Sequence, residues 1–243
     1  MALTTSPSDT NFFYLYQTPS LPCYLMHYIF YKKKMNKVST FLFAIAILWV
    51  STCCAQPSGY TLLSGGAANS IAQKITSTSS KMNTLQVDFT QEKSSKALTS
   101  KVVSKGKMSY KKTNFLRWTY TSPSSYSIIL NERGAFLKKG NSSTPNKALG
   151  ELGGLIARTI GGNGLVNNND FTISYYKSND ILVYMIPKNK RLQTMYKSME
   201  VYLNPQSYLA TKVKLFEKNG DVTTITFSNH KQNVTLPATE FKE

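Results

Sequence analysis

Hydrophobic and polar residues alternate along the segment from residue 104 to residue 131. Three short runs carry an apolar or aromatic side chain at every second position, and the polar turn around Asn114 and the break at Pro123 separate them. Because successive side chains of a strand point to opposite faces, this alternation predicts three antiparallel strands with one apolar and one solvated face. The apolar face is unusually rich in aromatic residues and contains methionine.

Alternating runs in the rest of the chain predict further strands over residues 85–89, 135–138, 171–175, 181–186, 192–203, 209–216 and 222–227, and a final extended segment over 232–243. Two stretches change to a helical period, residues 67–81 and residues 147–160. The sequence therefore predicts an α+β fold, in which one strongly curved antiparallel sheet of about 9–11 strands carries its helices on one face.

The helix predicted over residues 147–160 combines an apolar stripe with internal glycines. The stripe consists of Leu149, Leu152, Ile156 and Ile160. Gly150, Gly153 and Gly154 each destabilise a helix by roughly 1 kcal/mol relative to alanine. A weak helix with one apolar stripe is typical of a piece that packs on the sheet and can move, although an ordinary core helix that contains glycines has the same pattern.

The N-terminal part of the chain has the pattern of an export signal over residues 35–55. A basic start at Lys37 leads into the apolar run of residues 41–50, and Ala55 offers a small residue for cleavage. That run is shorter than the roughly 20 apolar residues of a membrane span. A retained membrane anchor, or a lipid-modified Cys53 or Cys54, remains an alternative.

These features predict four parts of the chain. Met35 is interpreted as the true start of translation, so that residues 1–34 are an upstream extension wrongly included in the sequence. Residues 35–55 are interpreted as a cleaved secretory signal peptide. Residues 56–66 are predicted to be a flexible lead-in rich in small residues. Residues 67–243 are predicted to form a single domain.

Catalytic and metal-binding residue sets are missing from the sequence after residue 55. Cys23, Cys53 and Cys54 all precede that point, and His230 is the one histidine that follows it. The acidic residues are dispersed among lysines, and no glycine-rich loop follows a strand and opens a helix. We therefore expect no disulfide, no metal site, no cofactor and no enzymatic activity.

The net charge of +17 indicates attraction to polyanions. The lysines, however, alternate with apolar residues on predicted strands, as at Lys105 and Lys107, which is typical of a solvated sheet face. A basic module that binds polyanions or mediates adhesion stays an alternative, and its affinity would fall steeply with salt.

The apolar face favours a protein that binds an apolar ligand. Methionine is flexible and polarizable, so it suits a surface that accepts varied apolar shapes. Part of the same face must also serve as the core between sheet and helices. The predicted cavity residues are Phe89, Met108, Leu116, Trp118, Tyr120, Ile128, Leu130, Met195 and Met199.

Four segments resemble the LolA family of periplasmic outer-membrane lipoprotein carrier proteins: QVDFTQEK (86–93), SKGKMSYKK (104–112), NFLRWTYTSP (114–123) and SIILN (127–131). The resemblance implies a half-open β-barrel with a helical lid over its concave face, formed here by the helix over residues 147–160. It implies a non-catalytic carrier or chaperone that takes triacylated lipoproteins from an inner-membrane ABC transporter to an outer-membrane acceptor. Export argues against nucleic acid as a partner, and a monomer is the default expectation. A periplasmic binder or sensor of another lipid on the same fold remains the alternative.

The resemblance also implies a latch that holds the lid closed. In the family, an arginine just before a proline, at the end of the second strand, bonds lid residues. Lys112 matches this arginine and Thr113 stands in place of the proline. Because lysine lacks the planar fork of donors that arginine has, Lys112 is only a candidate latch.

Overall fold

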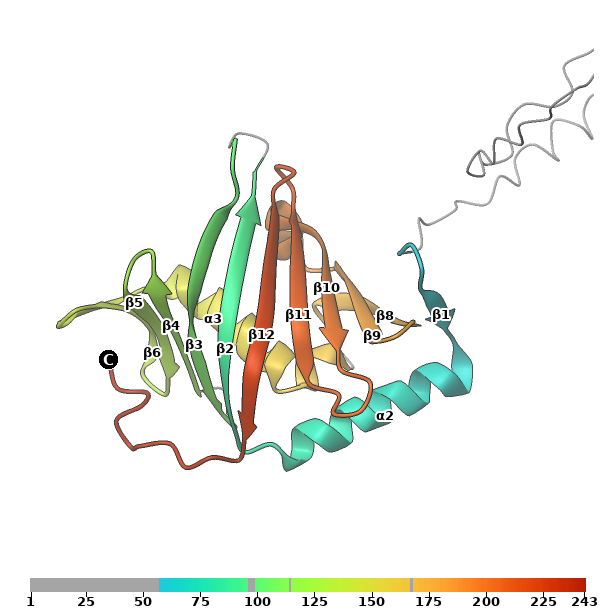
Figure 1. The fold of residues 1–243 in the computed structure, drawn as a ribbon, viewed down its shortest axis with the longest axis horizontal. Coiled ribbons are helices and arrows are strands. Elements are labelled where there is room, and N and C mark those ends of the chain that lie inside the picture. Colours follow the sequence, from blue (N-terminus) through green and yellow to red (C-terminus); the bar gives the residue numbers. More distant parts are fainter. Residues whose placement is uncertain (1–56, 96–98, 114, 167) are drawn as a thin grey trace, which may run out of the picture. The chain divides into compact units, whose positions relative to one another are not determined.

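The strands of the protein form one antiparallel sheet with two open edges (Figure 1). A computed structural model describes residues 57–95, 99–113, 115–166 and 168–243. The predicted signal peptide and upstream extension lie outside these residues. In the described part of the chain the sheet has twelve strands, in the order β1-β8-β9-β10-β11-β12-β2-β3-β4-β5-β6-β7. The strand bounds are β1 (Thr61–Leu63), β2 (Thr84–Ser94), β3 (Val102–Lys111), β4 (Phe115–Ser122), β5 (Tyr126–Asn131), β6 (Gly134–Lys139), β7 (Ser142–Pro145), β8 (Phe171–Lys177), β9 (Ile181–Pro187), β10 (Tyr196–Leu203), β11 (Ala210–Glu217) and β12 (Val222–Gln232).

The helices agree closely with the sequence pattern. α2 (Gly65–Lys81) begins two residues before its predicted start, and α3 (Lys147–Ile160) has its predicted bounds. A short 3₁₀ helix, η1 (Asn163–Leu165), follows α3, and a further helix, α4 (Lys190–Met195), precedes β10. Within the described ranges, no helix is long and apolar enough to cross a membrane.

The predicted α+β class with a single antiparallel sheet is confirmed, but the predicted number of strands and the predicted strong curvature were wrong. Two short edge strands raise the strand number to twelve, and one of them, β1, lies inside the predicted flexible lead-in, where it pairs with β8. The sheet is neither closed nor strongly curled. Residues 233–243 follow β12 without adding a strand among the described residues. The edge strands β1 and β7 have only three and four residues, which is too short for an alternation of apolar and polar residues to be detected.

The prediction of a continuous strand over residues 192–203 was also wrong. The side chain of Asn189 accepts a hydrogen bond from the backbone N–H of Arg191 and starts the helix α4. Met195 is the last residue of α4 and is 42% exposed, so it does not share the apolar face with Met199 of β10. The cavity role predicted for Met195 is therefore contradicted.

The main core lies between the sheet and the helices α2 and α3. Ile71 and Ile75 of α2 and Leu155 of α3 pack in one cluster with the apolar face of the central strands. That face includes the pair Phe89 and Gly106, directly opposite each other on β2 and β3. A Cβ atom at position 106 would lie 1.9 Å from the Thr119 carbonyl oxygen and 2.7 Å from the Phe89 ring, so only glycine fits there.

The C-terminal segment packs against β4 and β5. Arg117 Nη1 donates to the carbonyl oxygen of Glu240 at 2.9 Å, and Asn131 Nδ2 donates to that of Phe241 at 2.9 Å. The ring of Phe241 is buried against Phe115, with centroids 5.5 Å apart. Since side chains alternate along β4, these contacts lie on the face opposite Trp118, as the sequence predicts for Arg117.

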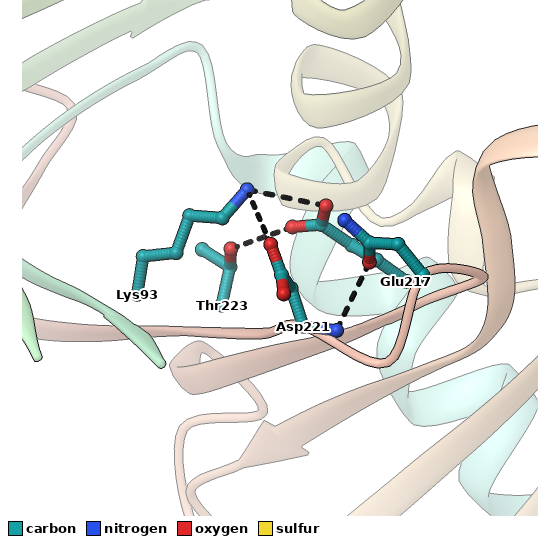
Figure 2. Close-up of polar contacts among 5 residues, drawn as sticks. Lys93, Glu217, Asp221 and Thr223 are labelled. Atoms are coloured by element: carbon teal, nitrogen blue, oxygen red, sulfur yellow. Dashed lines mark hydrogen bonds and ion pairs between the residues drawn. The ribbon is translucent and has the colours of Figure 1, made fainter. Parts of the chain in front are cut away.

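A polar cluster fastens the β11–β12 turn to β2, as Figure 2 shows. Lys93 Nζ lies 3.2 Å from Glu217 Oε2 and 3.3 Å from Asp221 Oδ2, and Thr223 Oγ1 donates to Glu217 Oε1 at 3.0 Å. A hydrogen bond from Ser95, with others from Lys93 and Asn219, lowers the pKa of Asp221. The Asp221 carboxylate therefore stabilises the fold above its ordinary titration range, and this contribution is lost as the pH falls through its lowered pKa.

Candidate functional site

α3 crosses the apolar face of the sheet (Figure 1). A small cavity lies between this helix and the sheet. Near the beginning of α3, a Cβ on Gly150 would lie 3.0 Å from Cβ of Ala135 on β6, and one on Gly153 would lie 3.8 Å from Leu116 on β4. Its last two turns face strands β10, β11 and β12. The cavity between them is lined by Trp118, Leu155, Ile156, Thr159, Ile160, Tyr196, Met199, Val213, Leu215, Ile225 and Phe227.

The size of this cavity decides what it can hold while α3 is in place. Its volume is about 30 Å³. A site that holds one water molecule needs roughly 10–15 Å³, so the cavity has room for only about two such small molecules. While α3 lies in this position, the cavity therefore has no room for a ligand as large as an acyl chain.

Most of the predicted cavity residues lie together under or beside α3. Phe89, Met108, Leu116, Trp118 and Met199 are almost fully buried, and Tyr120, Ile128 and Leu130 are partly buried against the same cluster. Of these, Trp118 and Met199 line the cavity itself. The structure thus brings together all of the predicted set except Met195.

Several cavity residues were missed by the sequence pattern. Four of them, Val213, Leu215, Ile225 and Phe227, come from β11 and β12. These strands lie far from β4 in the sequence but only four and three positions away in the sheet. Their alternation was visible in the sequence. The β12–β2 pairing that places them beside Trp118 was not, because it joins the two ends of the domain.

Four aromatic rings, those of Phe89, Trp118, Tyr120 and Phe227, form an aromatic floor, of which Trp118 and Phe227 line the cavity itself. Phe89 and Trp118 have centroids 4.3 Å apart, and Phe227 meets Trp118 edge-on at 6.1 Å. Tyr120 contacts Phe89 edge-on at 5.2 Å, and its hydroxyl donates to Gln91 Oε1 at 2.9 Å. Burial raises the pKa of Tyr120 to about 12, so this hydroxyl is neutral and stays a donor at physiological pH.

The residues that α3 buries match the predicted apolar stripe only in part. Ile156 and Ile160 pack against the core and line the cavity, and Leu149 is partly buried. The side chain of Leu152 lies outside the described residues. Among the described side chains of α3, Leu155 and Ala157 are the most buried, at 3% and 0% exposure. The predicted stripe did not include these two residues.

The two ends of α3 are held differently. At its start, the side chain of Asn146 accepts a hydrogen bond from the backbone N–H of Leu149 at 3.1 Å. At its end, Gly162 has a φ of +78°, and a Cβ there would lie 2.5 Å from Cβ of Ser79 on α2. The chain can therefore turn toward η1 beside α2 only with glycine at this position. The C-terminal end is thus packed against α2, whereas the N-terminal end lies on the edge of the sheet.

Polar contacts hold α3 weakly. Arg158 Nη2 lies 3.9 Å from Asp170 Oδ2, with both side chains more than a third exposed, and such surface pairs contribute little. The candidate latch Lys112 donates to the carbonyl oxygen of Ser80 at 3.0 Å, and Ser80 belongs to α2 rather than α3. Its ammonium group thus stabilises the C-terminal end of α2. The latch role on the lid remains a prediction without a contact that supports it.

We expect that replacing Gly153 and Gly154 together with alanine makes α3 more rigid. A methyl group at 153 would make an ordinary contact with Leu116, and one at 154 would lie 3.4 Å from the flexible end of Arg158. Each replacement should stabilise the helix by about 1 kcal/mol. Hydrogen exchange of the α3 amides, followed by mass spectrometry, should slow by roughly tenfold or more. Gly66→Ala in α2, where a Cβ meets nothing within 4 Å, is the control. Unchanged exchange in α3 would show that the glycines do not set its mobility.

The fold places the chain among proteins built as one open antiparallel sheet with helices over its apolar face. Comparison with solved structures gives matches of low sequence identity. A LolA superfamily protein from Nitrosomonas europaea is 12% identical, with a TM-score of 0.41, over 72% of this chain and 97% of its own. The MucA/MucB complex of Pseudomonas aeruginosa matches at 10% identity with a TM-score of 0.41, and the match covers 72% of this chain and 60% of the other chain. The lipoprotein LppX of Mycobacterium tuberculosis matches at 10% identity with a TM-score of 0.40, and the match covers 69% of this chain and 96% of LppX.

The sequence itself gives the family. Residues 80–243 match the family of the outer membrane lipoprotein carrier protein LolA, and this chain belongs to that family. Its members are typically non-catalytic carriers and are usually periplasmic. No curated protein is similar enough in sequence to count as a relative of the chain. The resemblance seen in residues 86–131 is thereby confirmed.

Proposed function

We propose that the protein is a periplasmic carrier that moves lipoproteins from the inner to the outer membrane, with their acyl chains bound between α3 and the sheet. The observation that carries this proposal is a small apolar cavity under a weakly held helix, in a chain of the LolA family. Opening of α3 would expose the aromatic floor and the buried residues around it, which together form one apolar surface.

The energetics fit a carrier that also releases its cargo. Burial of acyl chains contributes about 0.8 kcal/mol per methylene group, so a few chains bind tightly. Two features of α3 oppose its closure over an empty cavity. The first is its three internal glycines. The second is the buried hydroxyl of Thr159, which has no hydrogen-bond partner in the described structure. An unpaired buried polar group costs about 1–3 kcal/mol, which lowers the free energy needed to open the lid.

The remaining parts of the proposal follow from this role. Residues 35–55 would direct export and be cleaved, and an inner-membrane ABC transporter would load the carrier. An outer-membrane acceptor would receive the lipoprotein, with no cofactor and no chemistry on the cargo.

The outer face gives little support to the alternative of a polyanion-binding module. Its groove of about 640 Å³ is lined by the cations Lys107, Arg117 and Lys231, but also by the carboxylates of Asp88 and Glu240. His230 lines the same groove, and its Nε2 atom lies 2.8 Å from the carbonyl oxygen of Ala210. Mixed charges of this kind are typical of a solvated sheet face.

Native mass spectrometry of the purified protein with a triacylated lipoprotein in detergent tests the proposal. We expect a one-to-one complex that survives high salt, because apolar burial is not screened. Ile156→Asp places a charge in the cavity wall and should reduce complex formation by about tenfold or more. Ile186→Asp is the matched control, because this side chain is 46% exposed on β9. The absence of a complex, or one that salt alone dissolves, would overturn lipoprotein carriage.

A further inference from the structure

Two polar atoms are buried beside the cavity without a hydrogen-bond partner in the described structure. They are Nε1 of Trp118 and Oγ1 of Thr159. The two residues are 2% and 4% exposed, and both line the cavity. Trp118 belongs to β4 and Thr159 to α3, so the floor and the lid each supply one of these atoms.

Neighbouring groups do not satisfy the Trp118 indole. Tyr120 contacts the Trp118 ring with centroids 6.4 Å apart. The indole N–H is close enough to lower the pKa of the Tyr120 hydroxyl, but it does not reach hydrogen-bond geometry. The Tyr120 hydroxyl donates to Gln91 instead. The ring of Trp118 is fixed between Phe89 and Phe227, so the N–H cannot turn to another acceptor while these rings stay packed.

The chemistry of the two atoms specifies what could pair with them. An indole N–H can only donate, and a threonine hydroxyl can donate or accept. A ligand that pairs with both must therefore carry an oxygen acceptor into an otherwise apolar site. A plain hydrocarbon chain has no such atom, whereas the carbonyl oxygen of a fatty-acyl ester is an acceptor attached directly to an apolar chain.

We propose that Trp118 and Thr159 form a polar subsite that receives an ester carbonyl oxygen of a bound fatty-acyl lipid. This inference rests on the proposed function and adds which part of the cargo the protein recognises. The acyl tails would fill the space that α3 vacates, and the ester group would stop at Trp118, which fixes how deep the chains enter. The diacylglyceryl group of a lipoprotein and a glycerophospholipid share this ester chemistry.

The test compares an ester-linked ligand with its ether-linked analogue. The purified protein is titrated in detergent with a synthetic triacylated lipopeptide and with an analogue whose two glyceryl esters are replaced by ethers. We expect the wild type to bind the ester form about tenfold more tightly, as for a hydrogen bond to an otherwise unpaired buried donor. Trp118→Phe, which keeps the ring and removes the N–H, should bring the ratio close to one, and Thr159→Val should lower it.

Failure of the subsite and failure of the proposed function give different results. Equal affinity of the wild type for the two lipopeptides, or a ratio that Trp118→Phe leaves unchanged, overturns the subsite and leaves lipoprotein carriage standing. No binding of either lipopeptide overturns carriage, and it overturns the subsite as well if the diester phospholipid also fails to bind. A parallel titration with a diester and a diether phospholipid distinguishes the sources, since binding of the diester phospholipid alone would support the subsite and overturn carriage.

The ligand-free protein offers a second readout. Because the Thr159 hydroxyl has no partner, Thr159→Val should leave the Tm unchanged or raise it. Thr226→Val is the matched control, since Thr226 is exposed on β12. A clear fall of the Tm in Thr159→Val alone would show that the hydroxyl is paired in the closed protein and would overturn its place in the subsite.

Discussion

A disulfide between residues 135 and 150 is expected to abolish lipopeptide binding until it is reduced. Cβ of Ala135 lies 3.0 Å from the position that a Cβ on Gly150 would take, and the Cβ atoms of a disulfide are roughly 3.5–4.5 Å apart. An outward shift of about half an ångström in the first turn of α3 accommodates the bond. The disulfide then holds the N-terminal end of α3 on β6, while the other end is already packed beside α2.

The reason for a large effect is the small size of the cavity. About 30 Å³ cannot hold an acyl chain, so the affinity of the locked protein should fall by far more than about tenfold. The measurement is lipopeptide binding by Ala135→Cys/Gly150→Cys, oxidised and then reduced, with Cys23, Cys53 and Cys54 replaced by serine. Gly150→Cys alone controls for the side chain. Equal binding by the oxidised and reduced forms would show that the chains bind elsewhere.

Gly106→Ala is expected to be the most destabilising small substitution in the sheet. The added methyl group would lie 1.9 Å from the Thr119 carbonyl oxygen, which is part of the β3–β4 pairing and cannot move alone. It would also meet the Phe89 ring, which covers the glycine and contacts Trp118. Overpacking of a core costs about 1–3 kcal/mol and occasionally more, and a clash with backbone belongs at the upper end.

Thermal unfolding measures this effect. A loss of about 3 kcal/mol lowers the Tm by roughly 6–12 °C in a protein of this size. Gly66→Ala is again the control, because it adds the same methyl group in open space and should leave the Tm unchanged or slightly higher. Because the Phe89 ring must shift in Gly106→Ala, the near-ultraviolet circular dichroism of the aromatic floor should change as well. A Tm within about 2 °C of the wild type would show that β3 can move away from β4 at its bulge.

The sequence pattern predicts the central strands and both long helices of this fold. Alternation works there because one face of the sheet is buried and the other is wet, as along Leu116, Trp118 and Tyr120. It fails for β1 and β7, which are too short to show a period, and at Leu192–Met195, where the local cap at Asn189 prevails over an alternating pattern. Half-buried helices are harder still, because α3 buries Leu155 and Ala157 beside the stripe that its spacing indicates.

The candidate site was only partly predictable for a topological reason. Trp118 and Met199 could be identified as members of one apolar face, but β12 lies between β11 and β2, and this order decides that Ile225 and Phe227 complete the cavity. No local pattern carries that information. The unpaired state of Thr159 is likewise a property of its surroundings, because threonine on a helix usually finds a backbone carbonyl or water.

The two edges of the sheet bear on how the protein behaves in a crowded compartment. An exposed edge strand offers a row of unpaired backbone groups, which can recruit another chain and seed aggregation. Here β1 and β7 have only three and four residues, and β7 ends at Pro145, which has no N–H to donate. Short ends of this kind give a neighbouring molecule few backbone groups to pair with, so the sheet is protected from assembling edge to edge.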